Sequence, residues 1–230
     1  MPPCLILAAG FGTRMGALAA TRPKPLIKVE GRSLLDRALD VARDAGAHPI
    51  AVNAHYRADQ IAAHLAGQPD VSVLHETPNI LDSGGAVKNA LRIWPAGPVM
   101  TLNADNVWTG ENPLRQLAAA FVPAHMGALL LLVPRAEAVG RLGPGDFAMD
   151  ADGRLSLQKS GTALVYVGAQ ILEPAPIRAD PREVFSLRDI WAKYQAERRL
   201  FGLIHQGGWG DVGHPEGLAA AGALLDWSDV

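Results

Sequence analysis

The chain has 230 residues, of which 49% are hydrophobic and 19% charged, and its formal net charge at pH 7 is −2. This length suits one substantial hydrophobic core, and the near-zero charge excludes a general attraction to nucleic acid or to an anionic membrane. The single cysteine, Cys4, excludes an intrachain disulfide and a cysteine-based zinc site. With no secretory signal and no apolar run long enough to cross a bilayer, we expect a cytoplasmic protein.

Short apolar runs alternate along the chain with segments of helical periodicity. This alternation predicts an α/β fold with a Rossmann-like, mixed and mainly parallel central sheet flanked by helices. No repeat or long linker divides the chain, so we expect a single domain over residues 1–230. The strands are expected at 4–7, 49–52, 71–74, 99–102, 128–133, 162–167 and 200–204.

The expected helices begin at residues suited to capping or to tight turns. Ser33 and Asn112 are expected to cap two of them, and a glycine pair is expected to open another. Between Arg135 and about Ser160 the chain is rich in Gly, Asp and Pro, which predicts hairpins. The helices are expected at 34–46, around 61–65, from 83 to about 93, from 113, and at 187–197 and 215–225.

The loop after the first strand combines glycines with cations. It reads Leu7-Ala-Ala-Gly-Phe-Gly-Thr-Arg-Met15, and Pro23-Lys-Pro-Leu26 follows. Glycines let backbone N–H groups approach an anion, while Arg14 and Lys24 add positive charge. An ordinary strand–turn–helix connection accounts for one or two glycines but not for a lysine held between two prolines. The pattern therefore predicts a phosphate-binding loop.

Two familiar nucleotide motifs are excluded by spacing. A P-loop requires Gly-Lys-Ser/Thr four residues after its first glycine, and Gly10 is followed there by Met15-Gly-Ala17. A dinucleotide fingerprint requires Gly-x-Gly-x-x-Gly and an acidic residue after the second strand. Here Gly16 comes one residue too late, and the second strand runs into Asn53.

Two aspartates stand at positions suited to ligand binding. Asp105 follows an apolar strand, where open α/β sheets place their ligands, and Asp211 lies in a glycine-rich turn at 207–213. Taken singly, each is also compatible with a turn-forming aspartate.

These motifs, in this order, resemble those of the sugar-1-phosphate nucleotidyltransferases. Besides the phosphate loop, the matching segments are Leu81-Asp-Ser-Gly-Gly-Ala86, Leu102-Asn-Ala-Asp-Asn106, Gly145-Asp-Phe147 and Trp209-Gly-Asp-Val-Gly213. The resemblance spans nearly the whole chain. It implies the nucleotide-diphospho-sugar transferase fold, without the left-handed β-helix that many relatives append.

The resemblance implies transfer of a nucleotidyl group from a nucleoside triphosphate to a sugar 1-phosphate, with release of pyrophosphate. We expect UTP and N-acetylmuramate 1-phosphate as substrates, in cell-wall recycling. Mannose-1-phosphate guanylyl transfer and glucose-1-phosphate thymidylyl or uridylyl transfer stay open. Cytidylyl transfer to phosphocholine and a catalytically silent nucleotide-binding regulator are further alternatives, and the oligomeric state is not readable from the sequence.

The resemblance also implies roles for individual residues. Asp105 and Asp211 are expected to hold Mg²⁺, which favours one or two carboxylates together with phosphate oxygens, and Arg14 and Lys24 are the expected catalytic cations. Residues 1–110 are expected to bind the nucleotide and residues 111–230 the sugar phosphate. The expected nucleotide-binding residues are Ala8, Ala9, Gly10, Gly12, Thr13, Asn53, Glu76, Gly84 and Gly85, and the expected sugar-phosphate-binding residues are Asp146, Lys159 and Gly168. Asn53 and Glu76 are equally compatible with a turn asparagine and a surface glutamate.

Overall fold

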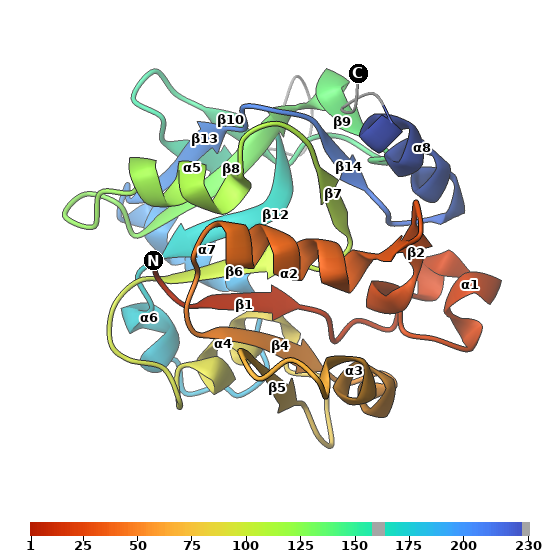
Figure 1. The fold of residues 1–230 in the computed structure, drawn as a ribbon. Helices are drawn as coiled ribbons and strands as arrows, with labels where there is room; N and C mark the ends of the chain where they lie inside the picture. Colours follow the sequence, from red (N-terminus) through yellow and green to blue (C-terminus); the bar gives the residue numbers. More distant parts are fainter. Residues whose placement is uncertain (158–163, 227–230) are drawn as a thin grey trace.

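The computed structural model describes residues 1–157 and 164–226, which form a central sheet with helices packed on both faces (Figure 1). Within these residues the sheet has nine strands, ordered β11-β10-β12-β6-β1-β4-β5, with β8 pairing to β12 and β13 pairing to β8. The strands are β1 (Cys4–Leu7), β4 (Ile50–Ala54), β5 (Val71–His75), β6 (Val99–Asn103), β8 (Ala128–Pro134), β10 (Phe147–Met149), β11 (Leu155–Leu157), β12 (Leu164–Leu172) and β13 (Leu200–Ile204). The predicted mixed α/β fold is confirmed.

The first strand lies in the middle of the sheet and is buried on both faces. It runs parallel to β4 on one side and to β6 on the other. Cys4 and Ile6 belong to one hydrophobic core and Leu5 to the other, because alternate side chains of a strand point to opposite faces. Burial raises the pKa of the Cys4 thiol to about 12, so this cysteine is a core residue, as expected.

Two groups of helices cover the two faces. The core on the side of Cys4 is closed by α2 (Leu34–Asp44), α3 (Ala58–Leu65) and α5 (Pro113–Ala120). The core on the side of Leu5 is closed by α4 (Asp82–Ala90), α6 (Ala175–Arg178) and α7 (Leu187–Ala196). The remaining helices are α1 (Ala17–Ala20) and α8 (Pro215–Asp226), with 3₁₀ turns η1 (Thr13–Met15), η2 (Lys24–Leu26) and η3 (Arg135–Glu137).

Several predicted local features are confirmed. The Ser33 hydroxyl accepts from Asp36 N at 3.0 Å, and the Asn112 side chain accepts from Leu114 N at 2.9 Å. The segment after Arg135 forms the short strands β9 (Ala138–Val139), β10 and β11. One helix is shorter than expected: α4 ends at Ala90, so Ile93 lies beyond it with 61% of its surface exposed.

A small second sheet was not predicted. It joins β7 (Asn106–Trp108), β14 (Trp209–Asp211) and β9, while β2 (Lys28–Val29) and β3 (Arg32–Ser33) form a separate ribbon. In it β14 runs antiparallel to β7, with Asp211 opposite Asn106. Strands this short show no periodicity along the chain, yet their pairing brings the C-terminal glycine-rich turn to the end of β6.

Among the described residues, none of the helices combines the length and the apolar character needed to cross a bilayer.

Candidate functional site

A cavity of about 350 Å³ opens at the carboxyl ends of β1, β4 and β6. This is the sheet edge at which open α/β folds bind ligands. Nine of its lining residues come from the phosphate loop and the Pro-Lys-Pro segment that follows it. The lining residues are Leu7, Ala8, Ala9, Gly10, Gly12, Thr13, Arg14, Lys24, Pro25, Asn53, Ile80, Asp82, Ser83, Asn103, Ala104, Asp105 and Gly213.

Backbone geometry explains the glycine at position 12. Gly12 has φ +65°, a conformation in which side chains are strained, and a Cβ on it would lie 3.0 Å from Lys24 Cβ. The loop is anchored below by Met15, which is 1% exposed in a core shared with Ile27. Gly12 therefore lets the phosphate loop close directly onto the Pro-Lys-Pro segment.

Lys24 and Asp105 form an ion pair at the floor of the cavity. Lys24 Nζ lies 2.6 Å from Asp105 Oδ2, although the residues are 81 positions apart in sequence. Only 8% of Lys24 is exposed. Because Pro23 and Pro25 are both buried and restrict the backbone, the lysine is held toward the carboxylate.

Asp211 lies beside this pair and is itself buried. Its backbone is opposite Asn106, and Val212 N donates to Asp105 O at 3.0 Å. Burial raises the pKa of the Asp211 carboxyl, and the neighbouring charge of Asp105 raises it further, against the opposing effect of Lys24, Arg141 and Arg14. Two acidic side chains thus share one partly buried region, an arrangement that favours a cation between them.

Asn53 and Glu76 form a hydrogen-bonded chain behind the cavity wall. Ala8 N donates to Asn53 Oδ1 at 2.7 Å, Asn53 Nδ2 donates to Glu76 Oε1 at 2.7 Å, and Leu81 N donates to Glu76 Oε2 at 2.8 Å. Asn53 lines the cavity, whereas Glu76 does not. Glu76, which was expected to bind the nucleotide, thus lies behind the cavity wall: both its oxygens bind protein groups, and it braces Ala8 through Asn53.

The glycine pair also has a different place from the one expected. Gly84 N and Gly85 N both donate to Phe185 O, at 2.9 and 3.1 Å. A Cβ on Gly84 would meet the Phe185 ring, and one on Gly85 would collide with the Glu183 carbonyl oxygen. These glycines let α4 pack closely against residues 183–185, and the cavity is instead lined by the preceding Asp82 and Ser83.

The residues expected to bind the sugar phosphate lie outside this cavity. Asp146 accepts from Arg141 Nη2 at 3.2 and 3.3 Å and from Tyr166 N at 3.1 Å. Gly168, at φ +81°, sits against Asn106 and Asn103, where a Cβ would not fit. Lys159 lies outside the described residues.

Several residues near the site were missed by sequence reasoning. The cavity is also lined by Asp82, Ser83 and Asn103. These three residues lie in the matching segments 81–86 and 102–106, in which only the glycine pair and Asp105 had been assigned a role. Arg141 acts electrostatically on Asp211 and bonds Asp146. No sequence signal indicated Arg141, because its position depends on β9 pairing with β14.

Comparison with known proteins gives a consistent result. A family model described as "MobA-like NTP transferase domain" matches residues 4–201. The chain is 36% identical over 231 residues to an N-acetylmuramate alpha-1-phosphate uridylyltransferase of Caulobacter vibrioides, covering 96% of each chain. It is 29% identical over 226 residues to the protein of the same name from Neisseria meningitidis, again with 96% of each covered. The crystal structure of HddC from Yersinia pseudotuberculosis superposes with a TM-score of 0.81 at 24% identity, over 98% of this chain and all of that one.

Proposed function

The chain belongs to the MobA-like NTP transferase family and is a nucleotidyltransferase, and on that premise we propose that it transfers the uridylyl group of UTP to N-acetylmuramate 1-phosphate. The products would be UDP-N-acetylmuramate and pyrophosphate. One observation supports the choice of substrates: the relatives from Caulobacter vibrioides and Neisseria meningitidis, each matched over 96% of its length, both bear this name. A cytoplasmic location remains part of the proposal.

The observation that carries the chemistry is the ion pair of Lys24 and Asp105 at the floor of the cavity, with the buried carboxyl of Asp211 beside it. We propose that the triphosphate lies along the loop from Ala8 to Arg14, with backbone N–H groups of this loop facing its oxygens. Arg14, which is exposed at the cavity, would bind the leaving pyrophosphate. Residues 1–110 would supply most of this half and residues 111–230 the acceptor half.

A divalent metal ion fits the two carboxylates. The donors are oxygen atoms only, and the raised pKa of Asp211 reflects a buried acid beside a second acid. Among residues 1–157 and 164–226 no group of three or more metal-ligating side chains is found, and Mg²⁺ commonly takes one or two carboxylates and completes its shell with phosphate and water. We therefore propose Asp105 and Asp211 as the residues that hold Mg²⁺, which would supply charge neutralisation at the reacting phosphates.

The reaction needs no general base, because the sugar phosphate is already an anion. An acceptor phosphate oxygen forms the new bond to the α-phosphorus, the bond from that phosphorus to the bridging oxygen breaks, and pyrophosphate takes the electron pair. The task of the protein is to align two anions and to balance their charge. Lys24, held by two prolines and by Asp105, would donate to an α-phosphate oxygen. Fixed donors of this kind commonly contribute factors of about 10²–10³ to kcat.

Pyrophosphate release across a matrix of nucleoside triphosphates and sugar 1-phosphates, with Mg²⁺ present, tests the proposal. We expect the highest kcat/KM with UTP and N-acetylmuramate 1-phosphate. Highest turnover with GTP and mannose 1-phosphate, or with a glucose 1-phosphate, would replace the proposed substrates. Turnover only with CTP and phosphocholine would make the protein a cytidylyltransferase of another class. Absence of turnover with every pair would favour a silent nucleotide-binding regulator.

A further inference from the structure

Asp146 lies between two arginines beyond the nucleotide cavity. Arg141 Nη2 lies 3.2 Å from Asp146 Oδ1, and Arg188 Nη2 lies 4.0 Å from the same oxygen. Asp146 is only 17% exposed in its side chain, whereas Arg188 is 62% exposed. One carboxylate therefore faces two guanidinium groups, which leaves an excess of positive charge on this side of the site.

The fold places this cluster next to Asp211. Arg141 lies two residues after the end of β9, whose Val139 pairs with Gly210 of β14, and the intervening Gly140 packs against the Asp211 carbonyl. Arg141 also acts electrostatically on Asp211, and its buried Nε has no hydrogen-bond partner. An acceptor that approaches Asp211 from the side away from the nucleotide cavity thus meets Arg141 and Asp146 first.

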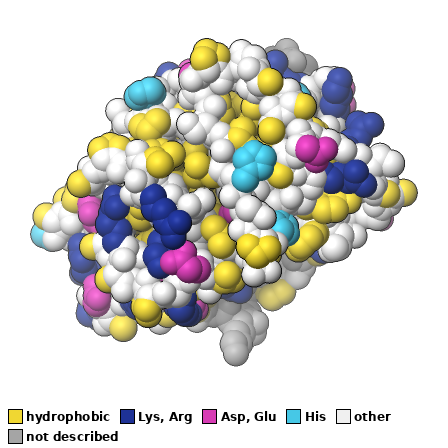
Figure 2. All heavy atoms as spheres, turned by 90° about the horizontal axis from the view of Figure 1, so that it is seen from below, with side chains coloured by type: hydrophobic (Ala, Val, Ile, Leu, Met, Phe, Trp, Pro, Cys, Tyr) yellow, Lys and Arg dark blue, Asp and Glu magenta, His cyan; other side chains and the backbone are white. Residues whose placement is uncertain are grey.

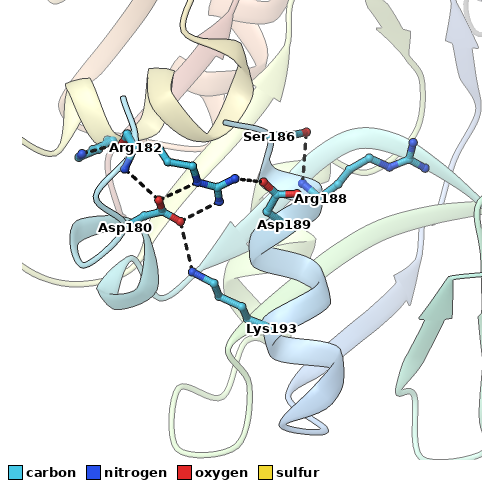
Figure 3. A network of polar contacts seen from close by, with 7 residues as sticks. Asp180, Arg182, Ser186, Arg188, Asp189 and Lys193 are labelled. Atoms are coloured by element: carbon cyan, nitrogen blue, oxygen red, sulfur yellow. Dashed lines mark hydrogen bonds and ion pairs between the residues drawn. The ribbon is translucent and has the colours of Figure 1, made fainter. Parts of the chain in front are cut away.

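The helix that carries Arg188 is held by a separate set of ion pairs (Figure 3). Asp189 accepts from Arg182 at 2.7 Å, and Asp180 pairs with Arg182 at 2.9 Å and with Lys193 at 3.2 Å. The Arg182 guanidinium holds the pKa of the Asp180 carboxyl well below its usual range. Figure 3 shows the Arg188 side chain extending away from this network.

Two further contacts fix α7 against the sheet. Trp191 Nε1 donates to Gln170 Oε1 at 2.9 Å, and the Trp191 ring meets the Tyr166 ring edge-on at 5.0 Å. On the face seen from below in Figure 1, Lys and Arg side chains lie beside Asp and Glu side chains (Figure 2). Arg92, for example, pairs with Glu183 at 2.8 Å, and Lys88 pairs with the same glutamate at 3.0 Å. Arg188 differs from these cations: among the described residues its only ion pair is the long, shared one with Asp146.

We propose that Arg188 determines specificity by binding a carboxylate that the acceptor carries in addition to its 1-phosphate. This inference rests on the proposed function, since it requires a sugar 1-phosphate as acceptor. Arg141 faces Asp211 and is placed for the phosphate end of such an acceptor, while Arg188 stands at the outer, exposed end. Asp146 holds both guanidinium groups in place. A guanidinium suits this task because it binds a carboxylate in a two-pronged geometry.

The test compares matched acceptors that differ in a carboxylate. One pair is N-acetylmuramate 1-phosphate and N-acetylglucosamine 1-phosphate, and the second is glucuronate 1-phosphate and glucose 1-phosphate. For wild type and Arg188→Ala, kcat/KM is measured with UTP by pyrophosphate release. We expect Arg188→Ala to lose at least tenfold with the acidic member of each pair and less than twofold with the neutral member.

Two further variants separate specificity from structure. Arg188→Lys keeps the charge and should retain part of the preference for the acid. Arg92→Ala removes an arginine that is 60% exposed and paired with Glu183, and it should leave the preference unchanged. Thermal unfolding of each variant shows whether the fold is intact.

The outcomes distinguish this inference from the proposed function. Equal losses with acidic and neutral acceptors in Arg188→Ala, or a wild-type preference for neutral acceptors, would overturn the role of Arg188. The first result leaves uridylyl transfer to N-acetylmuramate 1-phosphate standing. If wild type instead rejects that acceptor but prefers glucuronate 1-phosphate through Arg188, the inference holds and the proposed substrate is wrong. No transfer to any of the four acceptors would overturn both.

Discussion

The 2.6 Å contact between Lys24 Nζ and Asp105 Oδ2 joins the Pro-Lys-Pro segment to the turn that follows strand β6. The lysine occupies one oxygen of a carboxylate that we propose as a metal ligand. In the proposed site, Lys24 and a metal ion would compete for Asp105 until a nucleotide provided new partners for the lysine.

This competition predicts opposite effects on metal binding and on turnover. Lys24→Ala should bind Mg²⁺ more tightly than wild type without nucleotide, because Asp105 loses its internal cation. Its kcat should nevertheless fall by about 10²–10³, the usual effect of removing a donor to a transition-state oxyanion. Calorimetric titration with Mg²⁺ and steady-state kinetics measure the two effects, and Arg22→Ala, a neighbouring exposed cation, is the control. Weaker metal binding by Lys24→Ala would contradict the proposed metal site.

Asp211 should reduce the stability of the metal-free protein at neutral pH. Its pKa is raised in the folded state by burial and by Asp105, so the folded protein releases this proton at higher pH than the unfolded chain does. Stability therefore falls as pH rises from the unfolded pKa toward the folded pKa, and stays lower above it.

Asp211→Asn removes this titration. Without metal, the variant should unfold at a higher temperature than wild type at pH 7, and the difference should shrink as pH falls toward 4. Added Mg²⁺ should stabilise wild type but not the variant. Thermal unfolding over this pH range, with and without Mg²⁺, provides the measurement. A variant less stable than wild type at pH 7 would show that Asp211 is a structural acid.

Substitution by alanine should affect stability differently at Gly85, in the Asp-Ser-Gly-Gly motif, and at Gly10, in the phosphate loop. A Cβ on Gly85 would collide with the Glu183 carbonyl, whereas nothing lies within 4 Å of a Cβ on Gly10. Gly85→Ala should therefore lower the free energy of unfolding by about 1–3 kcal/mol, as overpacking commonly does. Gly10→Ala should keep its stability and raise the KM for UTP, since Gly10 lines the cavity. Denaturant unfolding gives the free energy of unfolding of both variants, and steady-state kinetics gives their KM for UTP. Equal loss of stability in the two variants would refute the prediction.

The corner between β4 and α3 should order the end of the phosphate loop. Arg57 Nη2 donates to Ala20 O at 2.6 Å, Tyr56 Oη to Ala19 O at 3.3 Å, and Gln60 Nε2 to Thr21 O at 3.2 Å. These bonds hold α1, which directly follows the loop.

Arg57→Ala should raise the KM for UTP about fivefold and change kcat less than twofold. A fivefold change corresponds to about 1 kcal/mol. This is the free energy that UTP binding must then spend on ordering the loop that Arg57 no longer holds. Arg57→Lys, which keeps a donor at this position, should recover much of the loss. The same kinetic assay measures both variants. A fall in kcat at unchanged KM would assign Arg57 a different role.

The sequence by itself determined the local parts of this protein. The alternation of apolar strands and amphipathic helices predicts the central sheet, because a helix buried along one stripe shows helical periodicity and a strand buried on both faces shows a short apolar run. Ser33 and Asn112 are recognisable as caps since their partners lie three residues away or closer. The phosphate loop was predicted from residue type and spacing, whereas the roles of Asp105 and Asp211 were implied by the resemblance to the sugar-1-phosphate nucleotidyltransferases.

Only the tertiary structure decided which of these residues meet. Asp211 reaches Asp105 through three-residue strands that carry no pattern, and Arg141 joins them through the pairing of β9 with β14. Gly84 and Gly85 serve the packing of α4 on Phe185, a residue about a hundred positions away. Contacts of this kind depend on chain segments that are distant in sequence, so residue type and spacing can nominate the participants, but only the folded arrangement assigns their partners.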